Sequence, residues 1–383
     1  MNELLTDEQQ LLLDSVREFV WSEVAPGVAQ RDRDSQCELS DFSSAFELGL
    51  HLLELPEEYG GSGIDFKTGA MVFEELGKVD AGYAITLVST FVAFRNVMLA
   101  GTPEQARLFA DKIAEGGLGC FAITEPGSGS DAASIRTTAV REGDEYVLNG
   151  QKCWITNGGI ADIYLISAKT DPSAGHRGIS TFLVEADRQG LEHGRHEDKM
   201  GLRTSNTCDL ILNDVRIPAD HLVGQEGQGF KIAMSGLDVS RPFMATIAVG
   251  MMQRALDEAM SYSLAREQFG QPIFEFQMVQ DLLARMSAKT VACRALVQHT
   301  MNLVDLGADV QKEGAITKQF VTDLLQEVVS DAVQVMGGNG YTKEYPVEKI
   351  MRDAKVFQIM EGTNQIQSIV IARQLRKEYG KRQ

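Results

Sequence analysis

The sequence has little positive charge and no long apolar run. Its 36 Lys and Arg residues are outnumbered by 54 Asp and Glu residues, which gives a formal net charge of −18. Nucleic-acid binding depends on a cationic surface, so this balance argues against a nucleic-acid partner. No stretch approaches the ~20 apolar residues that a membrane-spanning helix needs, which argues against membrane insertion.

Cysteines are few and scattered. The five lie at positions 37, 120, 153, 208 and 293 and form no CxxC pair. This usage is typical of reduced thiols in a cytoplasmic protein. The first residues are acidic and amphipathic, with Thr6 and Gln9 at capping-box spacing, so we expect an N-terminal helix and no basic, apolar targeting leader.

Two common site signatures are also missing. The Gly-Gly-Asn-Gly run at 337–340 does not belong to a GxGxxG fingerprint after a strand, so a Rossmann nucleotide site is unsupported. His193 and His196 lie in a charged loop without a third ligand, which favours an exposed loop over a metal centre.

Three sequence textures follow one another and predict an α+β protein. Residues 1–120 are typical of an α-helical domain, residues 121–230 contain several short strand patterns, and residues 231–383 return to long helical patterns. Closely spaced strands favour a small barrel or sandwich, and Asn149-Gly150 predicts a hairpin turn within it. The long helices favour a bundle. The junction between such domains is a usual place for a cofactor.

Four stretches carry candidate binding residues. The loop 120–134 has Gly127 and Gly129 among hydroxyl side chains, which suits close contact with a polar ring or phosphate but also an ordinary turn. Trp154 can pack on a flat cofactor or in a core. Arg266 near a helix end suits a diphosphate, although a solvated Arg is equally ordinary. The Gly337-Gly338 pair exposes backbone amides or simply ends a helix.

The fifth stretch, IMEGTNQIQ at 359–367, carries the strongest chemical signal. Glu361 precedes Gly362, and Thr363 is a plausible N-cap of a helix. A carboxylate in a tight apolar loop acquires the raised pKa that a proton-abstracting base needs. The alternative is that Glu361 only favours the helix start electrostatically.

Taken together, these stretches resemble the acyl-CoA dehydrogenase family over nearly the whole chain, through EEYGGSG, ITEPGSGSD, WITNGG, DKMGLRTSNT, VGQEGQGFKIAM, REQFGQPI, QVMGGNGY and IMEGTNQIQ. The short-chain acyl-CoA and butyryl-CoA dehydrogenase branch is the most similar. The resemblance implies an N-terminal helical domain, a central β-barrel and a C-terminal four-helix bundle, assembled as a homotetramer that is a dimer of dimers.

The resemblance also implies FAD between barrel and bundle. Residues matching contacts to the isoalloxazine and ribityl portions are Phe121, Ile123, Thr124, Gly129, Ser130, Trp154, Ile155 and Thr156. Those matching contacts to the adenine and diphosphate portion, partly from a neighbouring subunit, are Arg266, Phe269, Gln277, Gln334, Val335, Met336, Gly337 and Gly338. The helix-start contacts are Thr363, Asn364 and Gln365.

Glu361 matches the catalytic base of the family, and the residues near the CoA thioester are Ser130, Asp238, Arg241 and Gly362. The implied reaction converts an acyl-CoA to a trans-2-enoyl-CoA, with electrons passed to an electron-transferring flavoprotein. Asp238 and Arg241 stand three apart and are expected to share one helix face.

Three residues affect the prediction of which acyl group the protein takes. Met360 stands where many relatives have Tyr, and Phe91 is expected to shorten the acyl pocket. Arg95 could meet a polar acyl tail, although a surface charge or an ion pair is the simpler reading. These residues favour a short or compact acyl chain. Alternatives on the same scaffold are an enoyl-CoA reductase, an oxidase and an eliminating or desulfinating flavoprotein. A non-enzymatic interaction protein is the alternative from another class.

Overall fold

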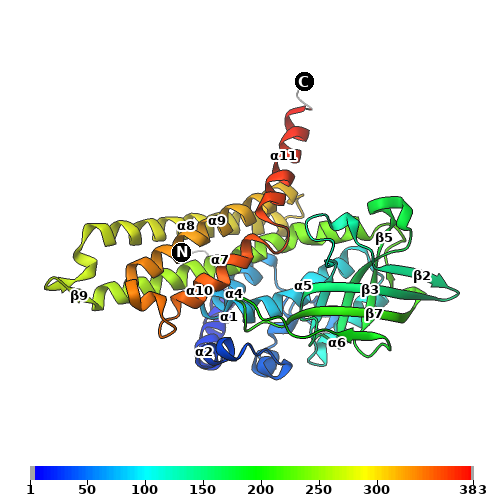
Figure 1. The fold of residues 1–383 in the computed structure, drawn as a ribbon, viewed down its shortest axis with the longest axis horizontal. Coiled ribbons are helices and arrows are strands. Elements are labelled where there is room, and N and C mark those ends of the chain that lie inside the picture. Colours follow the sequence, from blue (N-terminus) through cyan, green and yellow to red (C-terminus); the bar gives the residue numbers. More distant parts are fainter. Residues whose placement is uncertain (1–4, 381–383) are drawn as a thin grey trace.

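The computed structural model describes residues 5–380. The ends of the first and third expected domains, residues 1–4 and 381–383, lie outside the described residues, and so does the start of the sequence on which the absence of a leader was argued. The chain forms a helical N-terminal region, a β-sheet middle region and a C-terminal helical bundle (Figure 1).

The described part of the N-terminal region, from residue 5 onward, contains six α-helices, and a π-helical turn, Val20–Val24, joins the first two. The helices are α1 (Asp7–Phe19), α2 (Ala25–Asp34), α3 (Ser43–Glu47), α4 (Phe66–Val79), α5 (Ala81–Ala100) and α6 (Pro103–Ala114). The expected capping box at Thr6 is present, because its hydroxyl accepts from the Gln9 N–H and the Gln9 side chain accepts from the Thr6 N–H.

Helix α5 is apolar on every side. The expectation that no stretch approaches a membrane-spanning length and apolarity is wrong for α5, the one described helix that is long and apolar enough to cross a bilayer, but 72% of its most apolar window is buried inside the protein. It packs against α7 and β1. A helix that is hydrophobic all round and covered by other elements is a core helix of the fold.

The middle region is one eight-stranded sheet, in the order β6-β7-β3-β2-β4-β5-β8, with β1 added parallel to β4. Its strands are β1 (Gly119–Ala122), β2 (Thr138–Glu142), β3 (Glu145–Thr156), β4 (Ile163–Lys169), β5 (Ile179–Glu185), β6 (Leu191–His193), β7 (Thr207–Pro218) and β8 (Leu222–Val223). The sheet has a hydrophobic core of its own, whereas the N-terminal helices and the C-terminal bundle share a second, larger core.

The expected hairpin turn at Asn149-Gly150 is wrong. The β2–β3 turn lies at Gly143 and Asp144, and Asn149-Gly150 lies inside β3 at a register shift opposite β7. Gly150 is needed there because a Cβ atom would lie 2.5 Å from the Thr137 hydroxyl. A glycine inside a strand therefore marked a close approach of two chain segments rather than a turn.

The C-terminal region is dominated by three long helices, α7 (Gly229–Ala265), α8 (Gln277–Asp305) and α9 (Gln311–Met336), which pack against one another. The short strands β9 (Glu267–Gln268) and β10 (Gln271–Pro272) join α7 to α8 at the end of the bundle far from the sheet (Figure 1). Helices α10 (Val347–Ala354) and α11 (Asn364–Gly380) pack on α9, and the C-terminal part of α11 projects from the body.

Candidate active site

Glu361 is half-buried between the end of the 3₁₀ turn Lys355–Gln358 and the start of α11. Its Oε2 atom is shielded from solvent and has no hydrogen-bond partner among the described residues. Its backbone has φ of +55°, and Gly362 follows with φ of +85°. A non-glycine residue in the left-handed region is unusual and often marks a functional turn. One oxygen of this carboxylate therefore lies inside the protein, on a turn of unusual backbone conformation.

The backbone around Glu361 is held by three side chains. The Gln367 amide donates to the Gly362 carbonyl at 2.8 Å and to the Glu361 carbonyl at 3.2 Å. The Lys318 ammonium donates to the Gly362 carbonyl at 2.9 Å, and Arg241 Nε donates to the Glu361 carbonyl at 3.4 Å. Contacts from α7, α9 and α11 thus fix a turn that the local sequence alone would not favour.

Opposing effects act on the Glu361 carboxyl group. Burial raises its pKa, while the positive charges of Arg241, Lys318 and Arg95 act in the opposite direction; the net pKa is raised above the ordinary value. A carboxylate with a raised pKa is a stronger base, which suits proton abstraction.

Asp238 and Arg241 share one face of α7, as their spacing predicts. Their side chains form an ion pair, and Arg241 is buried. Asp238 also accepts from the Gln311 amide at 3.2 Å, and burial raises its pKa. Pro242 lies inside α7 and has no N–H for the Asp238 carbonyl, so the helix is irregular beside the base.

The start of α11 confirms one expectation and refines another. Thr363 caps the helix, because its hydroxyl accepts from the Ile366 N–H at 3.3 Å. Asn364 is buried, and its amide group bonds to Lys318, Thr322 and Asp323 of α9. Its side chain is therefore engaged within the protein and is not free to contact a cofactor. Gln365 is exposed.

The loop after β1 is anchored from beneath by a buried ion pair. Lys152 Nζ lies 2.8 Å from a carboxylate oxygen of Glu125 and 3.1 Å from the Ile123 carbonyl oxygen. Glu125 also accepts from the backbone N–H groups of Arg136 and Thr137. The upper side of the loop remains open, since Gly129 and Ser130 are exposed and Phe121, Ile123 and Thr124 are half-buried.

Trp154 stands beside this loop on β3. It has φ of +59° and lies where the β3–β7 register shifts, between Lys152 and Ile155. Its side chain is 62% exposed, so the alternative of a core tryptophan is wrong. Ile155 next to it is buried and Thr156 half-buried. The bulge thus presents a flat aromatic ring at the surface.

The residues expected at the adenine and diphosphate portion lie elsewhere in the chain. Arg266, Val335, Met336, Gly337 and Gly338 line a shallow groove of about 410 Å³ at the β9 end of the bundle. No Cβ clash would occur at either glycine. Three other expected residues, Gln334, Gln277 and Phe269, lie close to these in the sequence, and their side chains are exposed. Phe269 is 94% exposed and has φ of +55°. Figure 1 places this end of the bundle away from the sheet that carries Trp154.

Arg95 forms a buried ion pair rather than a surface charge. Its Nε atom donates to Glu54 at 2.7 Å, and its guanidinium lies 4.0 Å from the centroid of the Phe243 ring. Phe91, one turn earlier, is fully buried against Phe73. Met360 is partly buried against the helical core. The ion-pair reading of Arg95 therefore holds, and its guanidinium is already engaged.

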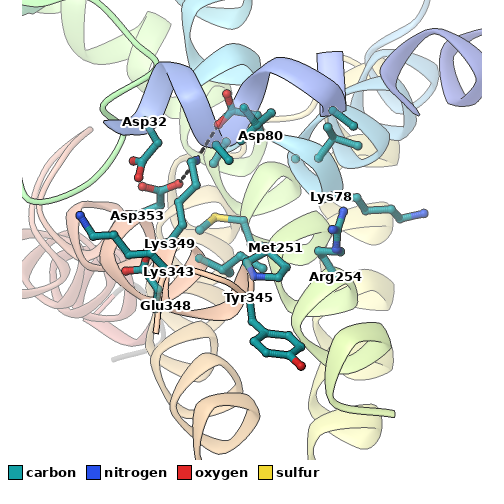
Figure 2. A pocket seen from close by; sticks show the side chains of 18 of the residues that line it. Asp32, Lys78, Asp80, Met251, Arg254, Lys343, Tyr345, Glu348, Lys349 and Asp353 are labelled. Carbon is teal, nitrogen blue, oxygen red and sulfur yellow. Dashed lines mark hydrogen bonds and ion pairs between the residues drawn. The ribbon is translucent and has the colours of Figure 1, made fainter. Parts of the chain in front are cut away.

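A separate cavity lies between α2, α4, α7 and α10 (Figure 2). Its volume is about 240 Å³, and its wall includes Asp32, Asp80, Lys349 and Asp353. The Lys349 ammonium bridges Asp80 and Asp353. None of the residues expected to bind flavin or thioester lines this cavity.

Sequence reasoning missed the residues that support the site: Glu54, Glu125, Lys152, Lys318 and Gln367. A lysine within an otherwise apolar helix stripe or strand was the available signal, because burial of a lysine requires a partner. The expected loop position is wrong for His193, which ends β6 opposite Leu210, whereas His196 lies in the loop that follows and is half-buried. The described residues contain no cluster suited to a metal ion.

Comparison with known proteins agrees with this arrangement. Models of the N-terminal, middle and C-terminal domains of acyl-CoA dehydrogenases match residues 6–117, 120–215 and 227–376. The cyclohex-1-ene-1-carbonyl-CoA dehydrogenase of Syntrophus aciditrophicus is 43% identical over 98% of this chain and 91% of its own.

Two solved structures are similar throughout. Butyryl-CoA dehydrogenase from Megasphaera elsdenii superposes with a TM-score of 0.95 at 41% identity, covering 98% of this chain and 100% of that one. A chain in a structure described as the electron transferring flavoprotein of Acidaminococcus fermentans has a TM-score of 0.95 at 44% identity, covering 98% and 99%. The chain therefore belongs to the acyl-CoA dehydrogenase family, whose members are flavoproteins, and is an oxidoreductase.

Proposed function

We propose that this protein is an FAD-dependent dehydrogenase that converts a short or compact acyl-CoA to the trans-2-enoyl-CoA, with Glu361 as the base. The observation that carries the proposal is the Oε2 atom of Glu361, which is shielded from solvent and has no partner among the described residues. A buried polar atom without a partner costs free energy, and a substrate proton would satisfy it.

The residues present fit a flavin. Trp154 offers an exposed ring at a bulge, and Gly127 and Gly129 leave open space where side chains would stand. These features, with Phe121, Thr124 and Thr156, would hold the isoalloxazine and ribityl portions. When bound, FAD would accept the β-hydrogen of the substrate as a hydride at N5.

The contacts to the adenine and diphosphate portion of FAD are proposed to come from a second copy of the chain. The groove lined by Arg266, Gly337 and Gly338 lies at the β9 end of the bundle, whereas Trp154 lies on the sheet. One chain therefore presents two half-sites in two places. A dimer of dimers, with four copies, is the assembly that the resemblance implies, and it would complete each flavin site.

In the proposed mechanism the protein binds, orients and moves one proton. The backbone N–H of Glu361 donates to the thioester carbonyl and makes the α-proton acidic. The Glu361 carboxylate then takes that proton. Arg241 and Gln367 hold the Glu361 carbonyl, which orients the N–H on the same turn. Burial excludes water and strengthens these interactions.

Phe91 and the Arg95–Glu54 pair occupy space beside α7 with buried side chains, which favours a short or compact acyl group. The relative from Syntrophus aciditrophicus is named for a cyclic acyl group and the structure from Megasphaera elsdenii for a four-carbon one. Both names suit a compact pocket. The five cysteines are free and buried, which suits the proposed cytoplasmic location.

The test is a panel of butyryl-CoA, longer linear acyl-CoAs and cyclohexane carbonyl-CoA, with bleaching of bound flavin as the readout. We expect the compact substrates to bleach the flavin. Glu361→Gln should keep the flavin and lose at least ~100-fold in the bleaching rate, as expected for removal of a general base. Glu192→Gln, an exposed carboxylate on β6, is the matched control. Near-normal bleaching by Glu361→Gln would reject Glu361 as the base.

The second candidate is the same chemistry run as an enoyl-CoA reductase, with electrons supplied by an electron-transferring flavoprotein. The similar chain in the structure described as the electron transferring flavoprotein of Acidaminococcus fermentans favours it. Reoxidation of chemically reduced protein by crotonyl-CoA, compared with bleaching by butyryl-CoA, distinguishes the two directions. If butyryl-CoA reduces an added electron-transferring flavoprotein faster than crotonyl-CoA reoxidises the reduced protein, the dehydrogenase direction is favoured.

A further inference from the structure

Lys318 differs from the other buried lysines. Three lysines are buried in the described part of the chain, namely 152, 318 and 349. Lys152 is paired with Glu125, and Lys349 with Asp80 and Asp353. Within residues 5–380, no carboxylate lies within ion-pair distance of Lys318. A buried ammonium without a carboxylate partner is costly and calls for an explanation.

The Lys318 ammonium is directed to the turn that carries Glu361. It donates to the Gly362 carbonyl at 2.9 Å and to the Asn364 side-chain oxygen at 2.8 Å. Asn364 in turn donates to Asp323 at 2.7 Å. Helix α9 is thus connected to the residues on the C-terminal side of the base. A non-glycine residue at φ of +55° is strained by about 1–3 kcal/mol, and such contacts hold it in place.

The charges around Glu361 single out Lys318. Arg241 faces the carboxylate from α7 but is paired with Asp238, and Arg95 faces it from α5 but is paired with Glu54. Lys318 faces it from α9, where the other acidic group, Asp323, is reached through Asn364. The positive charge of Lys318 is therefore not cancelled by a contacting carboxylate, and Glu361 is the acidic group that acts on it most strongly.

We propose that Lys318 is a positioning residue for proton abstraction: its ammonium fixes the 361–364 turn and keeps the Glu361 carboxylate ionised. The proposal rests on the proposed function, because it requires Glu361 to be the base. Lys318 does not touch the reacting atoms and acts through Glu361.

The electrostatic consequence is a coupled pair. Burial lowers the pKa of Lys318 to about 7, while the Glu361 charge acts to raise it. The Lys318 charge acts to lower the pKa of Glu361, which burial raises. Loss of the lysine charge would therefore raise the pKa of Glu361 further. Both limbs of the pH–rate profile then belong to the pair rather than to one residue.

The test compares two substitutions at one position. Lys318→Met removes both the charge and the donor, and Lys318→Gln removes the charge but keeps a donor. In flavin-loaded protein we expect both variants to shift the acid limb of kcat/KM upward by about one pH unit, the scale of a single nearby charge. Lys318→Met should also lose at least ~10-fold at neutral pH, with a smaller loss for Lys318→Gln.

Lys312→Met is the control, since this lysine lies on the same helix and pairs with Glu378 at the surface. Its acid limb should not move. An acid limb that stays in place in both Lys318 variants, with rates per flavin unchanged, would overturn the proposal. If Glu361→Gln abolishes activity while the Lys318 variants leave the limb unmoved, only this inference fails; if Glu361→Gln stays active, the proposed function fails first.

Thermal stability tests the buried lysine charge without turnover, so the result does not depend on how much flavin a variant binds. A buried lysine with a lowered pKa binds fewer protons in the folded state than in the unfolded state between pH 7 and about 10.5. Stability then rises with pH over that range. The unfolding midpoint of the wild-type protein should therefore rise relative to that of Lys318→Met as pH increases. Parallel curves would contradict the buried charge.

Discussion

The buried Glu125–Lys152 pair is expected to control both stability and flavin retention. Lys152 is fully buried and Glu125 is 7% exposed, and the pair supports the loop from Ile123 to Ser130. Removal of one member of a buried ion pair costs about 3–5 kcal/mol, because the other charge stays buried. Lys152→Met and Glu125→Gln should each lower the unfolding midpoint and weaken flavin retention.

The two substitutions should respond to pH in opposite directions. In Glu125→Gln, Lys152 loses the interaction that raises its pKa, so its pKa falls below the value of about 8 that burial gives it in the intact pair. The unfolded chain then binds the extra proton, and stability rises by up to about 1.4 kcal/mol per pH unit between pH 8 and 10.

In Lys152→Met the buried Glu125 loses the charge that lowers its pKa, so burial raises that pKa. The folded state then binds the extra proton, and stability falls as the pH rises through the acidic range above the ordinary value of about 4.3. The assay is thermal unfolding of the flavin-loaded variants from pH 5 to 10. The double variant Lys152→Met/Glu125→Gln should be less destabilised than the sum of the singles. Slopes of the same sign in both single variants would refute this reasoning.

Two further outcomes are expected. Arg266→Ala should weaken flavin retention without moving the pH profile, because Arg266 lines the groove away from Glu361; full flavin occupancy after dilution would count against its placement. Arg95→Met should destabilise the fold by about 3–5 kcal/mol as it strands the buried Glu54, with much of the stability regained in Arg95→Met/Glu54→Gln, as measured by chemical unfolding. An unchanged midpoint for Arg95→Met would show that the ion pair does not contribute.

The order of helices and strands could be predicted because it depends on local pattern. The helix that starts after Thr6, the short strands of the middle region and the long helices of the C-terminal region all appear where the patterns predict them. The turn predicted at Asn149-Gly150 was wrong because a glycine that favours a turn also permits close packing of two chain segments. The contact between Gly150 and Thr137, which the sequence does not reveal, decides between a turn and close packing.

The candidate site residues could be predicted from sequence motifs, but the buried lysines that hold them in place could not. Glu361, Arg241 and Trp154 were found from motifs that resemble a family. Lys152 and Lys318 were not, because a lysine in a helix or strand is usually a solvated charge. Their partners come from segments distant in sequence: 27 residues separate Lys152 from Glu125, and 44 separate Lys318 from Gly362. Such pairings are set by tertiary packing.

Backbone conformation explains why the site residues depend on contacts from distant segments. Of the seven described non-glycine residues with positive φ, three are candidate site residues: Trp154, Phe269 and Glu361. Each left-handed residue is strained by about 1–3 kcal/mol and persists only where its surroundings hold it. At Trp154 the holding structure is the β3–β7 bulge, and at Glu361 it is the set of donors from Lys318, Gln367 and Arg241.

This strain has a direct chemical use at position 361. A regular helical or extended residue there would continue the 3₁₀ turn or the chain direction, whereas the left-handed turn places a carboxylate inside the protein immediately before the N-terminus of α11. Burial then raises the pKa of the carboxyl group, while three cations limit the rise. Lys318 and Arg241 belong to both groups, because they hold the turn and also lower the pKa of Glu361, so the position and the basicity of Glu361 are expected to change together when either of them is removed.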